Sequence, residues 1–241
     1  MGEIINVIDL AKSIKGQIAE FVSQRANNGE IIPKIASIVV GEDGGSIFYI
    51  NSQEKVANSL GILFEKILLK ESTTEENLIN EIISLNNNEK IHGIILQLPL
   101  PKHIDEEAVL LAIDPDKDVD GFHPLNMGRL WSGHPVMIPS TPAGIMEMFH
   151  EYGIELEGKN AVVIGRSNIV GKPTAQLLLA KNATVTLTHS RTHNLAKVAA
   201  KADILVVAIG RAKFVTADFV KPGAVVIDVG MNRDENGKLC G

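Results

Sequence analysis

Residues 160–173 combine the residue types that a strand-to-helix phosphate site requires. The apolar run 161–164 ends at Gly165, and Gly171 and Pro173 begin a segment with leucines at helical spacing. A helix N-terminus after such a turn offers free N–H groups and a partial positive charge to a phosphate. Ser167 occupies the middle glycine position, so the usual G-x-G-x-x-G fingerprint is absent, and a tight turn without a ligand is the alternative.

Polar residues at the end of the next expected strand favour NADP over NAD as the dinucleotide. An NAD site usually places an Asp or Glu there to bind the ribose hydroxyls. This chain has Ser190 and Arg191 instead, with Arg166 on the preceding turn. An arginine can clamp a 2′-phosphate at two points, and a hydroxyl can donate to it. The alternative is that both arginines are solvated surface charges.

In the first half of the chain, three polar side chains are candidates for contact with a substrate. Tyr49 and Gln53 are four residues apart on an expected helix and share a face, and Gln97 ends an expected buried strand. An amide is a poor occupant of that place unless it has a partner or a ligand. For Tyr49 the alternative is a tyrosine in the core-facing stripe. Asp118 and Asp120 lie in an expected loop, where acids are usually solvated.

The composition is that of a globular intracellular protein. Of the 241 residues 45% are hydrophobic and 22% are charged, and the net charge is −6. The lack of basic runs argues against nucleic acid or an anionic membrane as a partner. Cys240 is the one cysteine, so no internal disulfide can form and the cytoplasm is expected. The acids have no His or Cys neighbours at metal-ligand spacing, so no metal site is expected.

Strands and helices are expected to alternate, which predicts the α/β class with mostly parallel sheets wound by helices. The expected strands are 35–40, 62–69, 91–98, 161–165, 184–188, 204–209 and 224–229. The expected helices are 9–27, 46–60, 74–85, 142–152, 173–181 and 194–200. The expected N-caps are Ser46, Thr74 together with Thr73, and Thr141. Residues 114–140 show little periodicity and are expected to form a long functional loop between two α/β units.

Six segments occur in a distinctive order: Gly41…Ser46-x-x-Tyr49, Gln97-Leu-Pro-Leu, Asp116-Lys-Asp-Val-Asp-Gly-Phe-His-Pro, Pro139-Ser-Thr-Pro-x-Gly144, Val163-Ile-Gly-Arg-Ser-x-Ile-Val-Gly-x-Pro173 and Val226-Ile-Asp-Val-Gly. With these segments the chain resembles the methylenetetrahydrofolate dehydrogenase/methenyltetrahydrofolate cyclohydrolase family, from about Ile8 to the end. The resemblance implies a folate-binding α/β domain at 1–140, a cleft, and a Rossmann NADP-binding domain at 141–241. It also implies a homodimer joined through the Rossmann domains.

The resemblance also implies roles for single residues. Tyr49 would stack on and orient the tetrahydrofolate substrate, Gln97 would hydrogen-bond near the reacting carbons, and Asp120 would bind the pterin edge. Arg166, Ser190 and Arg191 would hold the 2′-phosphate of NADP. The remaining residues expected to bind the cofactor are Thr141 and Gly210, near the nicotinamide and its ribose, and Gly165, Ser167 and Ile169 of the strand-to-helix turn.

One departure from the family pattern concerns catalysis, because Gln53 stands where the family has a lysine. The nearest lysine, Lys55, lies about 120° from Tyr49 around the helix, whereas Gln53 lies about 40° away. Hydride transfer depends mainly on alignment of donor and acceptor, but hydrolysis of the methenyl ring needs a group that moves protons. The main hypothesis is therefore a dehydrogenase with weak or absent cyclohydrolase activity. A fully bifunctional enzyme and a catalytically silent folate- or dinucleotide-binding protein are the alternatives.

A second departure concerns the C-terminus. The family continues beyond the point that corresponds to Gly241, with a glycine- and proline-rich segment and a final helix. The Rossmann domain is therefore expected to be shortened at its C-terminal end.

Overall fold

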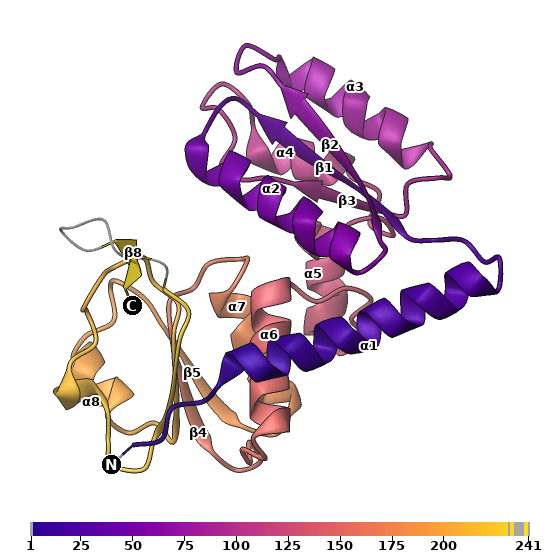
Figure 1. Ribbon diagram of the computed structural model, residues 1–241. Coiled ribbons are helices and arrows are strands. Elements are labelled where there is room, and N and C mark those ends of the chain that lie inside the picture. The colour runs from indigo at the N-terminus through magenta and orange to yellow at the C-terminus, as the bar shows by residue number, and fades with distance from the viewer. Residues whose placement is uncertain (1, 231, 234–238, 241) are drawn as a thin grey trace. The chain divides into compact units, whose positions relative to one another are not determined.

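Two units, Met1–Gly128 and Arg129–Gly241, make up the chain, and each contains its own parallel sheet (Figure 1). The computed structural model describes residues 2–230, 232–233 and 239–240. The expected alternation of strands and helices is confirmed, and the protein belongs to the α/β class. The expected domain boundary between residues 140 and 141 stays a prediction, and the last residues of the expected Rossmann domain lie partly outside the described residues.

The sheet of the N-terminal unit has the strand order β2-β1-β3, and all neighbours are parallel. Its strands are β1 (Lys34–Val40), β2 (Leu63–Leu69) and β3 (Gly93–Leu96). The helices that begin in this unit are α1 (Val7–Asn27), α2 (Gly44–Ser59), α3 (Glu75–Asn86), α4 (Glu106–Ala112) and α5 (Pro124–Trp131). Segment 114–140, expected to be a loop throughout, therefore contains a helix, and α4 is a helix that the sequence pattern did not reveal.

Alternation along β1 separates the two faces of this sheet. Ala36 and Ile38 belong to a buried apolar cluster that includes Leu78 and Ile82 of α3 and Val109 of α4. The residues between them on β1 face the other side, where α2 contacts β1 and β2. The sheet is therefore covered by helices on both faces, and polar residues of the site have to emerge at the strand ends.

The starts of the helices differ in part from the expectation. Thr74 caps α3 as predicted, because its side chain accepts a hydrogen bond from Asn77 N. The prediction for Ser46 is wrong: Asp43 caps α2, and its Oδ2 accepts from both Ser46 N and Ser46 Oγ. A carboxylate is at least as good an acceptor as a hydroxyl, and it captures the free N–H groups one turn earlier. The prediction for Thr141 is also wrong, because α6 begins at Ser140 without a side-chain cap.

The sheet of the C-terminal unit has the strand order β5-β4-β6-β7, again with parallel neighbours. Its strands are β4 (Asn160–Ile164), β5 (Thr184–Thr188), β6 (Ile204–Val207) and β7 (Val225–Asp228). The helices are α6 (Ser140–Glu151), α7 (Gly171–Ala180), α8 (Leu195–Ala199) and the short 3-10 helix η1 (Ala217–Phe219). A two-stranded antiparallel pair follows, β8 (Asn232–Arg233) with β9 (Leu239–Cys240).

Helices also cover both faces of this second sheet. Helix α7 contacts β4 and β5, whereas Ala199 of α8 and Phe219 of η1 share a buried cluster with Val162 and Leu205. None of the helices in the described ranges combines the length and the apolar character that crossing a membrane requires.

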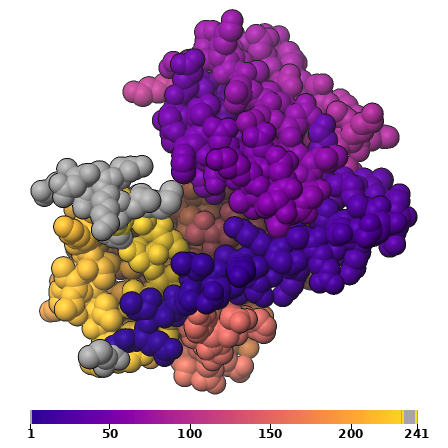
Figure 2. All heavy atoms as spheres, in the orientation of Figure 1, coloured from indigo at the N-terminus to yellow at the C-terminus, as the bar shows by residue number. Residues whose placement is uncertain are grey.

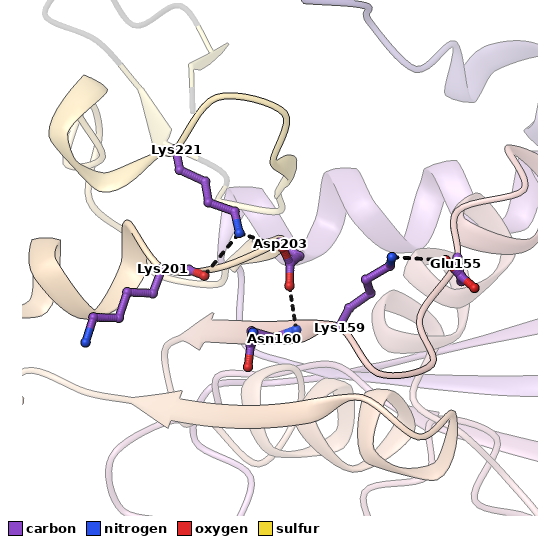
Figure 3. A network of polar contacts seen from close by, with 6 residues as sticks. All are labelled: Glu155, Lys159, Asn160, Lys201, Asp203 and Lys221. Carbon is purple, nitrogen blue, oxygen red and sulfur yellow. Dashed lines mark hydrogen bonds and ion pairs between the residues drawn. The ribbon is translucent and has the colours of Figure 1, made fainter.

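Asp203 joins the amino ends of three strands in the C-terminal sheet (Figure 3). Its Oδ2 accepts from Asn160 N at 2.8 Å, and its Oδ1 pairs with Lys221 Nζ at 2.5 Å. Lys221 also donates to the carbonyl of Lys201, and Val225 N donates to the Asp203 carbonyl. The Lys221 ammonium, together with the Asn160 N–H, holds the pKa of Asp203 below its usual value. The carboxylate is therefore favoured in the folded state.

We expect Asp203→Asn to lower the melting temperature slightly near neutral pH. A lowered pKa stabilises the fold above the ordinary carboxyl pKa, and this contribution is lost as the pH falls through the folded-state pKa. The difference from the parent chain should therefore shrink at about pH 3, as measured by thermal unfolding followed by circular dichroism. Glu155→Gln, which removes the neighbouring exposed ion pair with Lys159, is the control. An equal loss of melting temperature in both variants would contradict the role of Asp203 in joining the three strands.

Candidate functional site

Gln97 lies at the carboxyl end of β3 and is nearly buried, with 8% of its surface exposed. Its side-chain Nε2 donates to Ser37 Oγ at 3.0 Å and to Gln53 Oε1 at 2.7 Å. The oxygen and nitrogen of each amide are assigned from this hydrogen-bond network. A buried amide at this position is expected to need a partner, and Gln97 has two, Ser37 on β1 and Gln53 on α2.

Helix α2 brings Gln53, not Lys55, to Gln97. The side chain of Gln53 is half-buried, whereas the side chain of Lys55 is exposed. Tyr49 lies one turn before Gln53 and is 52% exposed, so the alternative of a core tyrosine is wrong. Figure 2 shows the side chains of α2 at the surface of the N-terminal unit. Tyr49 and Gln53 thus follow each other along one side of the helix, with Gln53 directed to the buried amide.

The segment that carries Asp120 runs beside β3. Ile94 N donates to Lys117 O at 2.7 Å, and Ile94 and Asp118 form a parallel bridge. A Cβ atom at Gly93 would lie only 2.4 Å from Val119 Cγ1, so glycine is needed for this close approach. This bridge is isolated, and Asp120 lies in the turn that follows it, where Gly121 N donates to Asp118 O.

Asp118 and Asp120 have different environments. Asp118 is 2% exposed, and its carboxylate accepts hydrogen bonds from the N–H groups of Phe122 and His123 and from Asn126 Nδ2. These bonds fix the turn that leads into α5. Burial, and to a smaller extent the charge of Asp118, raises the pKa of Asp120 to about 7. Asp120 is therefore a carboxyl group that can change its protonation state near neutral pH.

A cavity of about 280 Å³ lies at the carboxyl ends of β4, β5 and β6 in the C-terminal unit. Strand β4 has β5 on one side and β6 on the other, so the strand order reverses here, and ligands of open parallel sheets bind at such a point. Three of the predicted cofactor residues, Gly165, Arg166 and Ser190, line this cavity. The other five lie outside its lining, although all are in the described part of the chain: Thr141, Ser167, Ile169, Arg191 and Gly210.

The lining also contains residues that the sequence did not single out. Among these additional residues, His189 and Arg211 are polar, and Leu195, Ile209 and Phe214 form apolar walls. Arg211 comes two residues after the expected strand 204–209, so its position could have pointed to the strand-end site, although β6 itself ends at Val207. Leu195 and Phe214 belong to α8 and to the loop before η1, and only the tertiary structure brings them to the cavity.

The turn between β4 and α7 serves a close backbone approach despite its unusual glycine spacing. Gly165 has φ +115°, and a Cβ there would lie 2.2 Å from the Ala208 carbonyl oxygen. A Cβ at Gly171 would lie 2.1 Å from Gly165 O. Ser167 Oγ accepts from the N–H groups of Val170 and Gly171, each at 3.2 Å, and so stabilises the turn itself. The outer glycines thus keep the packing function of the common fingerprint.

The cavity fits the phosphorylated adenosine end of a dinucleotide. It offers two guanidinium groups, a hydroxyl and apolar walls, and no carboxylate is among the described residues of its lining. Arginine in this setting matches a phosphate by charge and by two-point hydrogen bonding. In the described ranges, no group of three or more His, Cys, Asp or Glu side chains is placed to hold a metal ion.

Two family models match most of the chain. Residues 5–120 match the tetrahydrofolate dehydrogenase/cyclohydrolase catalytic domain, and residues 139–241 match the NAD(P)-binding domain of the same family. The chain belongs to the tetrahydrofolate dehydrogenase/cyclohydrolase family. The family resemblance inferred from the sequence motifs is therefore confirmed, and the cavity lies in the NAD(P)-binding domain.

Individual family members are similar over nearly the whole chain. A bifunctional protein FolD of Streptococcus pneumoniae is 70% identical over 241 residues, which are 100% of this chain and 85% of that protein. The bifunctional FolD methylenetetrahydrofolate dehydrogenase/cyclohydrolase of Campylobacter jejuni has a TM-score of 0.94 at 41% identity, covering 96% of this chain and 82% of that one. The Trypanosoma brucei enzyme, solved with NADP and an inhibitor, has a TM-score of 0.93 at 35% identity, covering 100% and 84%.

We expect Asp120→Asn to stabilise the folded protein more at high pH than at low pH, relative to the parent chain. A raised pKa means that the stability contributed by the protonated carboxyl is present below the ordinary carboxyl pKa and is lost as the pH rises through about 7. Urea unfolding should show a relative gain of roughly 2 kcal/mol for the variant between about pH 5 and about pH 8. Glu89→Gln, at an exposed acid, should show no such change. A pH-independent effect of Asp120→Asn would contradict the raised pKa.

Proposed function

We propose that this protein oxidises 5,10-methylenetetrahydrofolate to 5,10-methenyltetrahydrofolate with NADP, and that it also opens the methenyl ring, but slowly. The observation that carries the proposal is the hydrogen-bonded pair Gln97–Gln53 at the carboxyl end of β3, inside the domain that matches the family's catalytic domain. This pair can align a substrate, but neither amide can accept or supply a proton at neutral pH.

The folate end of the site is proposed to use three side chains. Gln97, fixed by Ser37 and Gln53, presents the rest of its amide near the reacting carbons. Tyr49 is exposed on α2 and is free to pack against a flat ring. Asp120 binds the pterin edge, where its raised pKa would make binding depend on pH near neutrality. Alignment of this kind is sufficient for hydride transfer, because the reaction depends on the distance and orientation of donor and acceptor.

The NADP preference is proposed from the cavity of the C-terminal unit. Bound there, the nicotinamide cofactor supplies the hydride acceptor. Arg166 and Ser190 would hold the 2′-phosphate, and Thr141 and Gly210 are proposed to lie near the nicotinamide end. The similar Trypanosoma brucei enzyme, solved with NADP, supports this choice. The family resemblance also leads us to propose a homodimer.

Two observations bear on the rate of the cyclohydrolase activity relative to the dehydrogenase activity. The similar proteins from Streptococcus pneumoniae and Campylobacter jejuni are both described as bifunctional, which favours the presence of both activities. The neutral amide of Gln53, which is hydrogen-bonded to Gln97, argues against full cyclohydrolase activity. Lys55 is exposed and two residues further around the helix, so it is a poor replacement. A fully bifunctional enzyme is therefore the second candidate, favoured by these relatives.

The proposal is tested by following methenyl formation from methylenetetrahydrofolate with NADP or NAD, and then methenyl decay in the same cuvette. We expect formation with a preference for NADP, followed by slow decay. Fast decay would favour the fully bifunctional candidate. Absence of both reactions, with retained ligand binding, would indicate a silent binding protein and would contradict the proposal.

Gln53→Lys should raise the decay of the methenyl compound by about 100-fold while changing its formation only a few-fold, because general acid–base catalysis is typically worth 10²–10⁴. The matched control is Lys55→Gln, which removes an exposed lysine two positions away and should leave both reactions unchanged. A loss of cyclohydrolase activity in Lys55→Gln would show that Lys55 is the proton-transfer group and would overturn the role of Gln53.

A further inference from the structure

Arg211 packs against an aromatic ring at the rim of the dinucleotide cavity. Its guanidinium carbon lies 4.6 Å from the ring centroid of Phe214, a cation–π contact. Phe214 in turn meets Phe219 edge to face, with 5.6 Å between ring centroids, and Phe219 is 9% exposed within a core cluster. The ring that contacts Arg211 is therefore anchored to the core, and it supports one face of the exposed guanidinium.

Arg211 and Arg166 reach the same cavity from different strands. Arg166 follows β4 and Arg211 follows β6, and His189 and Ser190 at the end of β5 complete the polar lining. None of the described residues that line the cavity is a carboxylate. Arg166, Arg191 and Arg211 are all exposed, but Arg191, the second arginine that the sequence assigned to the 2′-phosphate, lies outside the lining.

A cation–π contact by itself does not explain the position of Arg211. The chain contains another such contact, between Arg25 and Phe21 of α1 at 5.7 Å, and there the guanidinium is paired with Glu30 at 3.0 Å. Arg25 thus serves the fold at the end of its own helix. Arg211 has the same kind of aromatic contact, but it lines a cavity that holds a second guanidinium and, among the described residues, no acid.

We infer that Arg211 is a specificity-determining residue for the cofactor, which binds the 2′-phosphate together with Arg166 in the place that the sequence gave to Arg191. The inference rests on the proposed NADP-dependent function. A 2′-phosphomonoester carries one to two negative charges near neutral pH, and two guanidinium groups can bind it with charge-assisted hydrogen bonds. A dinucleotide without this phosphate gains nothing from the second arginine.

The test uses calorimetric binding of two small probes to the full chain, 2′,5′-ADP and 5′-AMP, so that no turnover is required. Arg211→Gln should weaken binding of 2′,5′-ADP by about tenfold or more and leave 5′-AMP unchanged, because the lost charge-assisted hydrogen bonds are made to the 2′-phosphate alone. Arg211→Lys, which keeps the charge but loses the planar fork, should recover part of the loss. Arg25→Gln, at the other cation–π pair, is the matched control and should bind both probes as the parent does.

A second reading uses pH. The advantage of the parent over Arg211→Gln for 2′,5′-ADP should grow from about pH 5 to about pH 7, as the second proton of the 2′-phosphate is lost near pH 6. Equal weakening of both probes, or a larger loss from Arg191→Gln than from Arg211→Gln, would overturn the inference while NADP binding stands. If the parent chain prefers 5′-AMP or binds neither probe, the proposed NADP preference fails together with the inference.

Discussion

Parallel strands cannot be joined by tight turns, so every connection between neighbours in the two sheets returns across a face of the sheet, and most do so through a helix. The helices that cover these faces leave one place where polar side chains reach a ligand without burial against apolar residues, namely the edge at the carboxyl ends of the strands. Gln97 follows β3 at such an edge, and Arg166, Ser190 and Arg211 follow strands of the second sheet. Both candidate sites are consequences of this one constraint.

At the first edge, the cost of burying polar groups determines the arrangement. An amide buried without partners would be destabilising, and Gln97 avoids this because Ser37 and Gln53 both accept from its Nε2. The glutamine at position 53 is therefore a stable occupant of the site and not a defect in it. The same hydrogen bond leaves two neutral amides side by side, which favours alignment of a substrate over movement of protons. The balance between dehydrogenase and cyclohydrolase activity in this family member therefore depends on whether the site only aligns the substrate or also moves protons.

The two edges of the C-terminal sheet differ in charge. At the amino edge, Asp203 is neutralised by Lys221 and by the Asn160 N–H, so that the charges there stabilise the fold. At the carboxyl edge, Arg166 and Arg211 line a cavity whose described lining residues include no carboxylate. Positive charge gathered in this way raises the stability of the unliganded protein very little, but it favours an anionic ligand. Charge is thus used for stability at one edge and for binding at the other.

The sequence by itself determined the α/β class, the order of most strands and helices, and the family, because apolar periodicity and short motifs are local properties of the chain. It singled out Gln97, Gln53, Arg166 and Ser190 as candidates, because each lies just after an expected strand or at helical spacing from another candidate, and their roles stay predictions. It did not reveal α4 or α5, and it assigned N-caps to Ser46 and Thr141 that are not used, because neighbouring acceptors and packing decide where a short helix begins. Only the tertiary structure decided that Gln53 bonds to Gln97, that Asp120 lies where burial raises its pKa, and that Arg211 rather than Arg191 lines the cavity. Each of these depends on contacts between elements far apart in the chain, whose distances no local pattern encodes.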